Sequence, residues 1–119
     1  MIIQSKRVWV CGHFMEAQLE MEDGKIKNIF SYGTKEVDKD YGDRRIVPGF
    51  IDVHTHGAVG VDVNAATAED YEKICRFAAG NGTTSWLCSV LTDTKEQTEW
   101  CIDEYKKHQK MEHKGANLL

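Results

Sequence analysis

Apolar and polar residues alternate over the first forty residues, as they do in a sheet with one buried face. Residues 14–21 alternate strictly, with Met, Ala, Leu and Met on one side and mostly acidic or polar residues on the other. Gly24 lies in the turn that follows, where a positive φ costs glycine little. We therefore predict a hairpin over residues 14–32, preceded by a strand over residues 2–10.

The pattern changes near residue 44. Residues 45–53 form an almost continuous apolar run, interrupted only by Pro48, Gly49 and Asp52, which is typical of a strand buried on both faces of a parallel sheet. A helix is expected next, because Thr67 can cap a helix whose apolar positions then recur at helical spacing. The remaining predicted elements are a strand over 83–91, a helix over 94–110 and a strand beginning at 116.

This order predicts an α/β fold in two parts, a small β-sheet over residues 1–43 and a βαβα segment over residues 44–119. Two βα units are too few to close a barrel, which takes about eight strands. The apolar end of the chain, at the start of a predicted strand, leads us to expect a truncated domain.

Composition narrows the functional classes. Of 119 residues, 41% are hydrophobic and 29% charged, as in a globular protein, and the net charge of -4 argues against a nucleic-acid partner. No apolar segment resembles a signal peptide or a membrane span, so we expect a cytoplasmic protein with no membrane partner. The four cysteines form no C-x-x-C pair and are expected to be reduced, mostly packed thiols.

The strongest chemical signal is a pair of histidines at the end of the apolar run. His54 and His56 are two residues apart, so in a strand both side chains project to the same face. Neutral imidazoles suit zinc, iron and similar ions. The H-x-H spacing alone is weak evidence, but its position at the C-terminal end of a predicted buried strand favours a metal site. The other histidines, His13, His108 and His113, lie outside such a spacing and are expected to pack or face solvent.

The surrounding residues resemble a known group of enzymes. The segment PGFIDVHTHG is similar to the first barrel strand of the amidohydrolase superfamily, whose usual form is P-G-x-[IV]-D-x-H-x-H. Within that superfamily the chain is most similar to the N-acetylglucosamine-6-phosphate deacetylases. That similarity runs over the whole length and includes RIVPGFIDVHTHG, the following AVGVDVN and the later NGTTSWLCSVLT.

The resemblance implies an architecture and a reaction. Residues 1–43 would be part of a β-sandwich, and residues 44–119 the first portion of a TIM-type metallo-dependent hydrolase barrel. The complete enzyme would hydrolyse the acetamide C–N bond of N-acetylglucosamine 6-phosphate to glucosamine 6-phosphate and acetate, a step of amino-sugar catabolism. Its partners would be this small amino-sugar phosphate and further copies of itself in a homo-oligomer.

The resemblance also assigns roles to residues. His54 and His56 match ligands of a divalent metal, zinc or iron, which polarises the carbonyl and activates water. The family's remaining ligands and its catalytic Asp would lie beyond Leu119, so no catalytic residue is expected in this chain, and the 119-residue polypeptide is expected to be inactive alone. Asp52 would brace the strand end, whereas Asp62 and Asn64 could either line a substrate pocket or bond nearby backbone amides.

Two other functions fit the same residues. H-x-H is shared with dihydroorotases, hydantoinases and deaminases, so a related amidohydrolase is one alternative. The other is a non-catalytic scaffold that self-associates, because an open sheet this small would leave strand edges unpaired.

Overall fold

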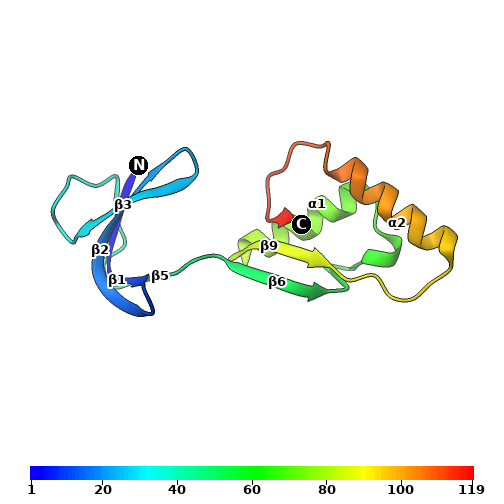
Figure 1. The fold of residues 1–119 in the computed structure, drawn as a ribbon, viewed down its shortest axis with the longest axis horizontal. Coiled ribbons are helices and arrows are strands. Elements are labelled where there is room, and N and C mark those ends of the chain that lie inside the picture. The colour runs from blue at the N-terminus through cyan, green and yellow to red at the C-terminus, as the bar shows by residue number, and fades with distance from the viewer. The chain divides into compact units, whose positions relative to one another are not determined.

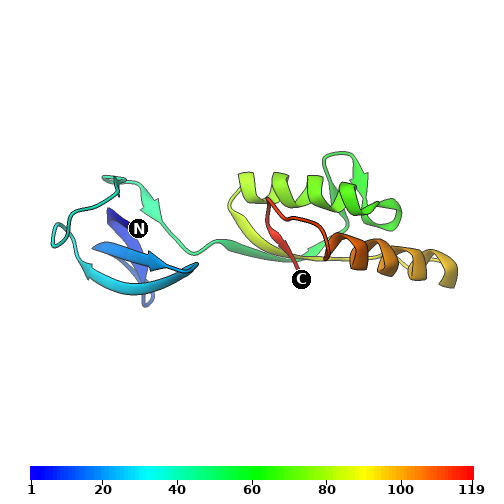
Figure 2. The same ribbon diagram turned by 90° about the horizontal axis from the view of Figure 1, so that it is seen from above.

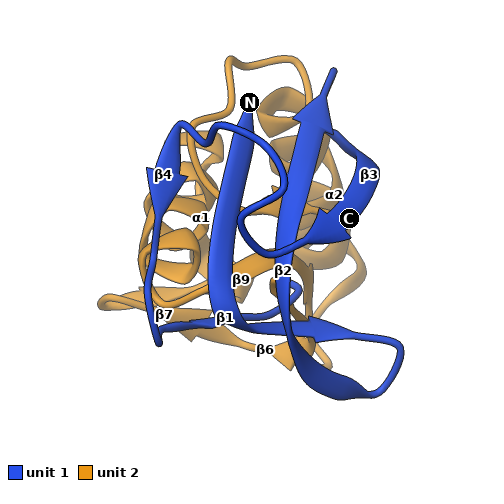
Figure 3. Cartoon of the chain, turned by 90° about the vertical axis from the view of Figure 1, so that its left-hand side faces the viewer, with its two compact units in different colours: residues 1–48 blue, residues 49–119 orange.

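A computed structural model describes residues 1–119 as two compact units, residues 1–48 and residues 49–119 (Figures 1 and 3). The sequence places the boundary between residues 43 and 44, whereas the units divide after Pro48. The reason is strand β5 (Arg45–Ile46), which pairs with β1 (Ile2–Val10) and therefore belongs to the first unit.

The first unit is one five-stranded sheet (Figure 1). Its middle is an antiparallel meander in which β2 lies between β1 and β3, and the predicted hairpin is confirmed. Two short strands, β4 and β5, run parallel to β1 along its other edge. The remaining bounds are β2 (His13–Glu22), β3 (Lys25–Ser31) and β4 (Lys39–Asp40).

The predicted apolar face of this sheet is buried only in its middle. Ala17 and Leu19 are buried with Val8, but Met15 is 38% exposed. Gln18, on the opposite face, is fully buried, and its side chain bonds to Gln4 and to the Lys35 carbonyl in the loop after β3. Simple alternation therefore describes this strand incompletely, since a polar loop covers its other face.

The second unit is a mixed α/β unit in the predicted order. Its parallel sheet has the order β10-β9-β6, so strands consecutive in the chain are neighbours in the sheet (Figures 1 and 2). Helix α1 packs against β9, and α2 packs against α1. No helix is long and apolar enough to cross a membrane. The bounds are β6 (Phe50–Thr55), β7 (Gly57–Ala58), β8 (Val61–Asp62), η1 (Val63–Ala65), α1 (Ala68–Gly80), β9 (Thr83–Cys88), α2 (Lys95–His108) and β10 (Asn117–Leu118).

The prediction of one strand over residues 45–53, buried on both faces, is wrong. Residues 47–49 separate β5 from β6, because Pro48 has no N–H to donate to a sheet ladder. Within β6 the side chains of Phe50, Ile51 and Val53 are 63%, 64% and 67% exposed. The strand lies at the sheet edge with β9 as its one neighbour, so its apolar residues lack the cover that a central strand receives.

The predicted helix starts are confirmed. Thr67 and Asp70 form a complete capping box at the start of α1, and Thr94 caps α2 by accepting a hydrogen bond from the Gln97 N–H. Helix α1 turns Tyr71, Ile74 and Cys75 inward against Trp86 of β9, which together form the centre of the unit's core. Packing of this amphipathic face supplies most of the helix's stability.

Glu104 of α2 provides a testable link between the helices. Its buried carboxylate accepts a 2.9 Å hydrogen bond from the Ala68 N–H, one of the donors left free at the start of α1. The ion pair with Lys107 and, with a smaller effect, the hydrogen bond from the Ala68 N–H hold the pKa of Glu104 below the usual 4.5. A carboxyl group with a lowered folded-state pKa stabilises the fold above its unfolded-state pKa, and this contribution disappears as pH falls through the folded-state pKa.

We therefore expect Glu104→Gln to lower the thermal unfolding midpoint at pH 7 and to differ little from the parent well below pH 4. The helical circular dichroism signal is the measurement, because both helices belong to the second unit. Glu99→Gln, an exposed position on the same helix, is the matched control and should change little at either pH. Equal destabilisation by Glu104→Gln at both pH values would contradict this role of the charge.

Candidate metal centre

The structure brings the two predicted ligands together at the C-terminal end of β6. The Nε2 atoms of His54 and His56 are 3.1 Å apart, and the rings meet edge to face with centroids separated by 4.8 Å. Both side chains are exposed, and each ring's one polar side-chain contact is with the other ring. Two imidazole nitrogens thus lie together, and when the protons are on Nδ1 both Nε2 atoms present lone pairs to the same small region.

Asp52 fixes the backbone that carries this pair. One carboxylate oxygen accepts a 2.9 Å hydrogen bond from the His54 N–H, and the other accepts a 2.5 Å hydrogen bond from the Thr55 hydroxyl. These two hydrogen bonds, of which the one from Thr55 has the larger effect, lower the pKa of Asp52, so the carboxylate stays ionised. Asp52 therefore braces the strand end, the role that the family resemblance implies for it.

Gly57 fixes the backbone on the other side of the pair. Its φ is +149°, and an added Cβ would lie 2.0 Å from the carbonyl oxygen of Val61 in the β7–β8 ribbon. That ribbon returns to the pair, because the Val63 N–H donates to the His56 carbonyl at 2.9 Å. A glycine is thus required immediately after His56 for the chain to turn back on itself.

The spacing of the two nitrogens fits a shared metal ion. Zinc bound at about 2.0–2.1 Å by two nitrogens in tetrahedral geometry holds them about 3.3 Å apart, close to the 3.1 Å observed. Catalytic zinc normally takes about three protein ligands. No other His, Cys, Asp or Glu of the chain joins this pair in a cluster of three, so the pair is an incomplete site.

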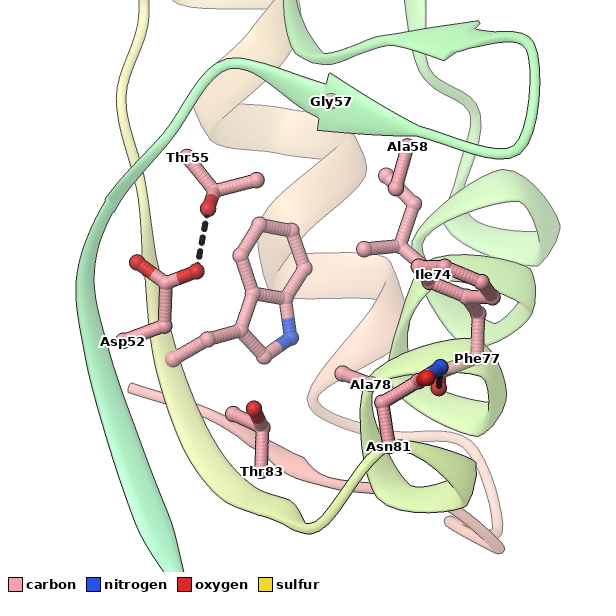
Figure 4. Close-up of a pocket in the computed structure, with 10 residues that line it drawn as sticks. Asp52, Thr55, Gly57, Ala58, Ile74, Phe77, Ala78, Asn81 and Thr83 are labelled. Carbon is pink, nitrogen blue, oxygen red and sulfur yellow. Dashed lines mark hydrogen bonds between the residues drawn. The ribbon is translucent and has the colours of Figure 1, made fainter.

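A cavity of about 250 Å³ lies between α1 and the strands β6 and β9 (Figure 4). Its polar groups include Asp52 and Thr55, which bond to each other (Figure 4). Trp86 also lines it. Its other walls are largely apolar, and neither His54 nor His56 lines it. This cavity is therefore separate from the metal-ligand pair.

The two pocket candidates after the motif are engaged in local structure. Asp62 caps η1 by accepting a hydrogen bond from the Asn64 N–H at 2.9 Å. The Asn64 side chain bonds to both the N–H and the carbonyl of Leu91, and also to Asp93. These contacts tie η1 to the loop after β9 and favour the structural interpretation of both residues.

A second group of candidate ligands was not predicted. Glu72 and Cys75 of α1 and His108 of α2 are all buried, with ligand atoms within 4.8 Å of one another, so the three could hold a metal ion. His108 was expected only to pack or face solvent. The available signal was the i,i+3 spacing of Glu72 and Cys75 on one helix face, but nothing in the sequence joins that face to a residue 33 positions later. His13 is exposed on β2.

Comparison with known proteins relates the chain to the amidohydrolases. It is 30% identical over 100 residues to an N-acetylglucosamine-6-phosphate deacetylase of Vibrio furnissii, a match covering 82% of this chain and 25% of the relative. The corresponding Bacillus subtilis deacetylase is 28% identical over 106 residues, covering 83% of this chain and 27% of the relative. The chain thus spans about a quarter of the length of these curated relatives. No family model matches it.

Over most of its length the chain is homologous to N-acetylglucosamine-6-phosphate deacetylases. An N-acetylgalactosamine-6-phosphate deacetylase of Escherichia coli O157:H7 is also similar, at 31% identity over 71% of this chain and 21% of that protein. The relatives are thus N-acetylhexosamine-6-phosphate deacetylases.

The fold agrees with a solved structure. A Mycobacterium smegmatis N-acetyl-D-glucosamine-6-phosphate deacetylase variant, in complex with N-acetyl-D-glucosamine-6-phosphate, matches with a TM-score of 0.82 and 21% identity. The match covers 90% of this chain and 29% of that one. The mixed α/β fold, which comprises a small β-sheet and a unit of parallel strands and helices, therefore matches part of such a deacetylase.

Proposed function

We propose that this chain contributes the His54–His56 pair to the divalent-metal site of an N-acetylhexosamine-6-phosphate deacetylase. The observation that carries the proposal is the 3.1 Å separation of the two Nε2 atoms at the end of β6, in a chain homologous to these deacetylases. We further propose that residues 1–43 are part of a β-sandwich and that residues 44–119 form the first part of a TIM-type barrel.

In this proposal the chain's own residues position the ion. His54 and His56 bind as neutral imidazoles, and the Asp52 carboxylate and the turn at Gly57 keep both rings on one side of the strand. A bound zinc or iron would polarise the acetamide carbonyl and activate water. Because two ligands are too few, residues outside this chain would supply the rest, together with the catalytic base.

The test uses the chain alone and a chimera in which it replaces the matching segment of the Bacillus subtilis deacetylase. Acetate release from N-acetylglucosamine 6-phosphate is measured with and without a chelator. The chain alone should release no more acetate than its His54→Gln/His56→Gln variant. The chimera should be active and metal-dependent, and either His→Gln change should reduce its activity by at least about 100-fold, since even losing an outer-shell partner costs about 10–100-fold.

A matched control is His13→Gln, which changes an exposed histidine of the first unit and should leave the chimera's activity intact. Circular dichroism establishes that each chimera is folded. The proposal fails if a folded chimera in which both His54 and His56 are replaced by Gln retains its activity. It also fails if the isolated chain itself shows metal-dependent turnover.

Similarity to the galactosamine enzyme favours testing a second substrate. The two sugars differ in configuration at one carbon, and the relatives include deacetylases named for each. Assaying both 6-phosphates with the chimera and with the parent Bacillus subtilis deacetylase shows whether this segment changes the preference between the two sugars.

The exposed apolar side chains of β6 favour one alternative, a self-associating scaffold. A metal-free oligomer of the isolated chain, seen by size-exclusion mass at several concentrations, would support that alternative.

A further inference from the structure

The buried cluster between α1 and α2 contains polar atoms that protein contacts leave unsatisfied. Glu72 and His108 are 6% and 1% exposed, yet Oε2 of Glu72 and Nδ1 of His108 have no hydrogen-bond partner. Two imidazole nitrogens lie close to Glu72 Oε2, His108 Nε2 at 3.5 Å and His113 Nδ1 at 3.9 Å. Burying a carboxylate oxygen without a partner is costly, so something else is expected to satisfy it.

The other oxygen of the same carboxylate is fully occupied. Oε1 of Glu72 accepts hydrogen bonds from Arg76 Nε at 3.0 Å and from the Lys114 N–H at 3.1 Å. These two donors orient the carboxylate so that Oε2 points toward the two histidines. Outer contacts of this kind typically orient a metal ligand and leave its coordinating atom free.

Cys75 completes a set of soft and borderline ligands. Its Sγ lies 3.9 Å from His108 Nε2 and accepts a 3.2 Å hydrogen bond from Trp86 Nε1. Cys75 is fully buried, so a thiolate here needs a cation, and the indole N–H of Trp86 would stabilise the thiolate further. A metal ion that displaces the thiol proton supplies that cation.

We propose that Glu72, Cys75, His108 and His113 form a structural zinc site, separate from the His54–His56 pair. Tetrahedral zinc, with bonds of about 2.0–2.1 Å to N or O and 2.3 Å to S, spaces its ligand atoms about 3.3–3.6 Å apart. Three ligand pairs are 3.5, 3.9 and 3.9 Å apart, and the ligand atoms of Glu72, Cys75 and His108 all lie within 4.8 Å of one another. His113 contacts this group through Glu72, and its imidazole would have to move toward Cys75 and His108 to complete a tetrahedron. A mixed N, O and S set favours zinc over magnesium or calcium.

The site would join three segments that are distant in the sequence. Glu72 and Cys75 come from α1, His108 from the last turn of α2, and His113 from the loop that leads to β10. Four protein ligands leave no open coordination position, so the ion would hold the helices and this loop together without taking part in catalysis. The side chain of His113 is 34% exposed, which gives zinc a route to the three buried ligands.

The experiment uses the full chain with His54→Gln and His56→Gln in place, so that the other candidate site cannot contribute. Zinc binding is measured under reducing conditions by competition with a chromophoric chelator, and cobalt is substituted to detect a thiolate-to-metal charge-transfer band. We expect one zinc per chain and a cobalt spectrum typical of tetrahedral coordination that includes this band.

The variants separate a zinc site from a buried hydrogen-bond network. Cys75→Ser should abolish the charge-transfer band and weaken zinc binding at least about 100-fold. Trp86→Phe removes only the indole N–H that donates to the Cys75 sulfur, and it should weaken zinc binding about 10-fold. Cys101→Ser, another buried cysteine of the same unit, is the matched control and should bind zinc like the parent.

His113→Ala is the second test variant, for use if Cys75→Ser fails to fold. His113 lies in a loop with its side chain 34% exposed, so its removal does not open the core. Its zinc binding should fall about 10–100-fold. The proposal is overturned if the parent binds no stoichiometric zinc, if cobalt gives no thiolate band, or if His113→Ala binds zinc as the parent does. Because these measurements are made without His54 and His56, their outcome is independent of the deacetylase assay.

Discussion

Replacing Gly115 with alanine is expected to destabilise the second unit by at least about 3 kcal/mol, at the upper end of overpacking effects. A Cβ at this position would lie 2.3 Å from the carbonyl carbon of Cys75 and 2.5 Å from both the Cys75 oxygen and the Arg76 nitrogen. These are backbone atoms of α1, so no side-chain rotation relieves the clash. This close approach also holds the segment before β10 against α1, because the adjacent Ala116 N–H donates to the Cys75 carbonyl at 2.8 Å.

The measurement is denaturant unfolding followed by the helical circular dichroism signal. Gly80→Ala is the matched control, since a Cβ there meets nothing within 4 Å and the residue closes α1. Alanine should stabilise that position slightly, by about 0.4–1 kcal/mol. Equal stabilities of the two variants would show that the segment before β10 does not pack on α1 as described.

Trp86→Ala should have the second large effect, a loss of about 3–5 kcal/mol. The side chain is 1% exposed and packs among the buried residues of α1, where its indole N–H also donates to Cys75. Truncation would leave a large void in a small core and remove that hydrogen bond. Small domains have only about 5–15 kcal/mol of stability in total, so much of the unit should unfold at moderate denaturant concentrations.

Trp100→Ala is the comparison, because Trp100 is only partly buried on α2. It should cost clearly less than Trp86→Ala when both are measured in chelator, which removes any contribution of bound zinc. A Trp86→Ala variant as stable as Trp100→Ala would contradict the described core.

Local signals in the sequence predicted the helix starts of the second unit well. Thr67 and Thr94 mark both helix starts because capping depends on residues within one turn. The H-x-H spacing placed His54 and His56 on one face because strand geometry alone fixes that relation.

Features that depend on distant partners were not predictable in this way. The apolar run of β6 indicates burial, but whether Ile51 is covered depends on neighbours that the strand itself does not specify. Gln18 is buried because a loop reaches it from the other side, and periodicity contains no information about that loop. The Glu72–Cys75–His108 cluster forms only when two helices pack, so spacing within either helix reveals half of it.

The pairing of β1 has a consequence for the order of folding. Strand β1, nearest the start of the chain, has its parallel neighbours at residues 39–46. The Ser5 hydroxyl lies within hydrogen-bond distance of the carbonyls of Gly42 and Arg44 and can donate to either. The β1–β2–β3 meander is complete once residue 31 has left the ribosome, but its β1 edge stays open until residues 39–46, eight to fifteen positions further along, have also emerged. Pairing with residues so far from β1 in the sequence is slow, so during synthesis this edge of the nascent sheet is exposed to pairing with another strand.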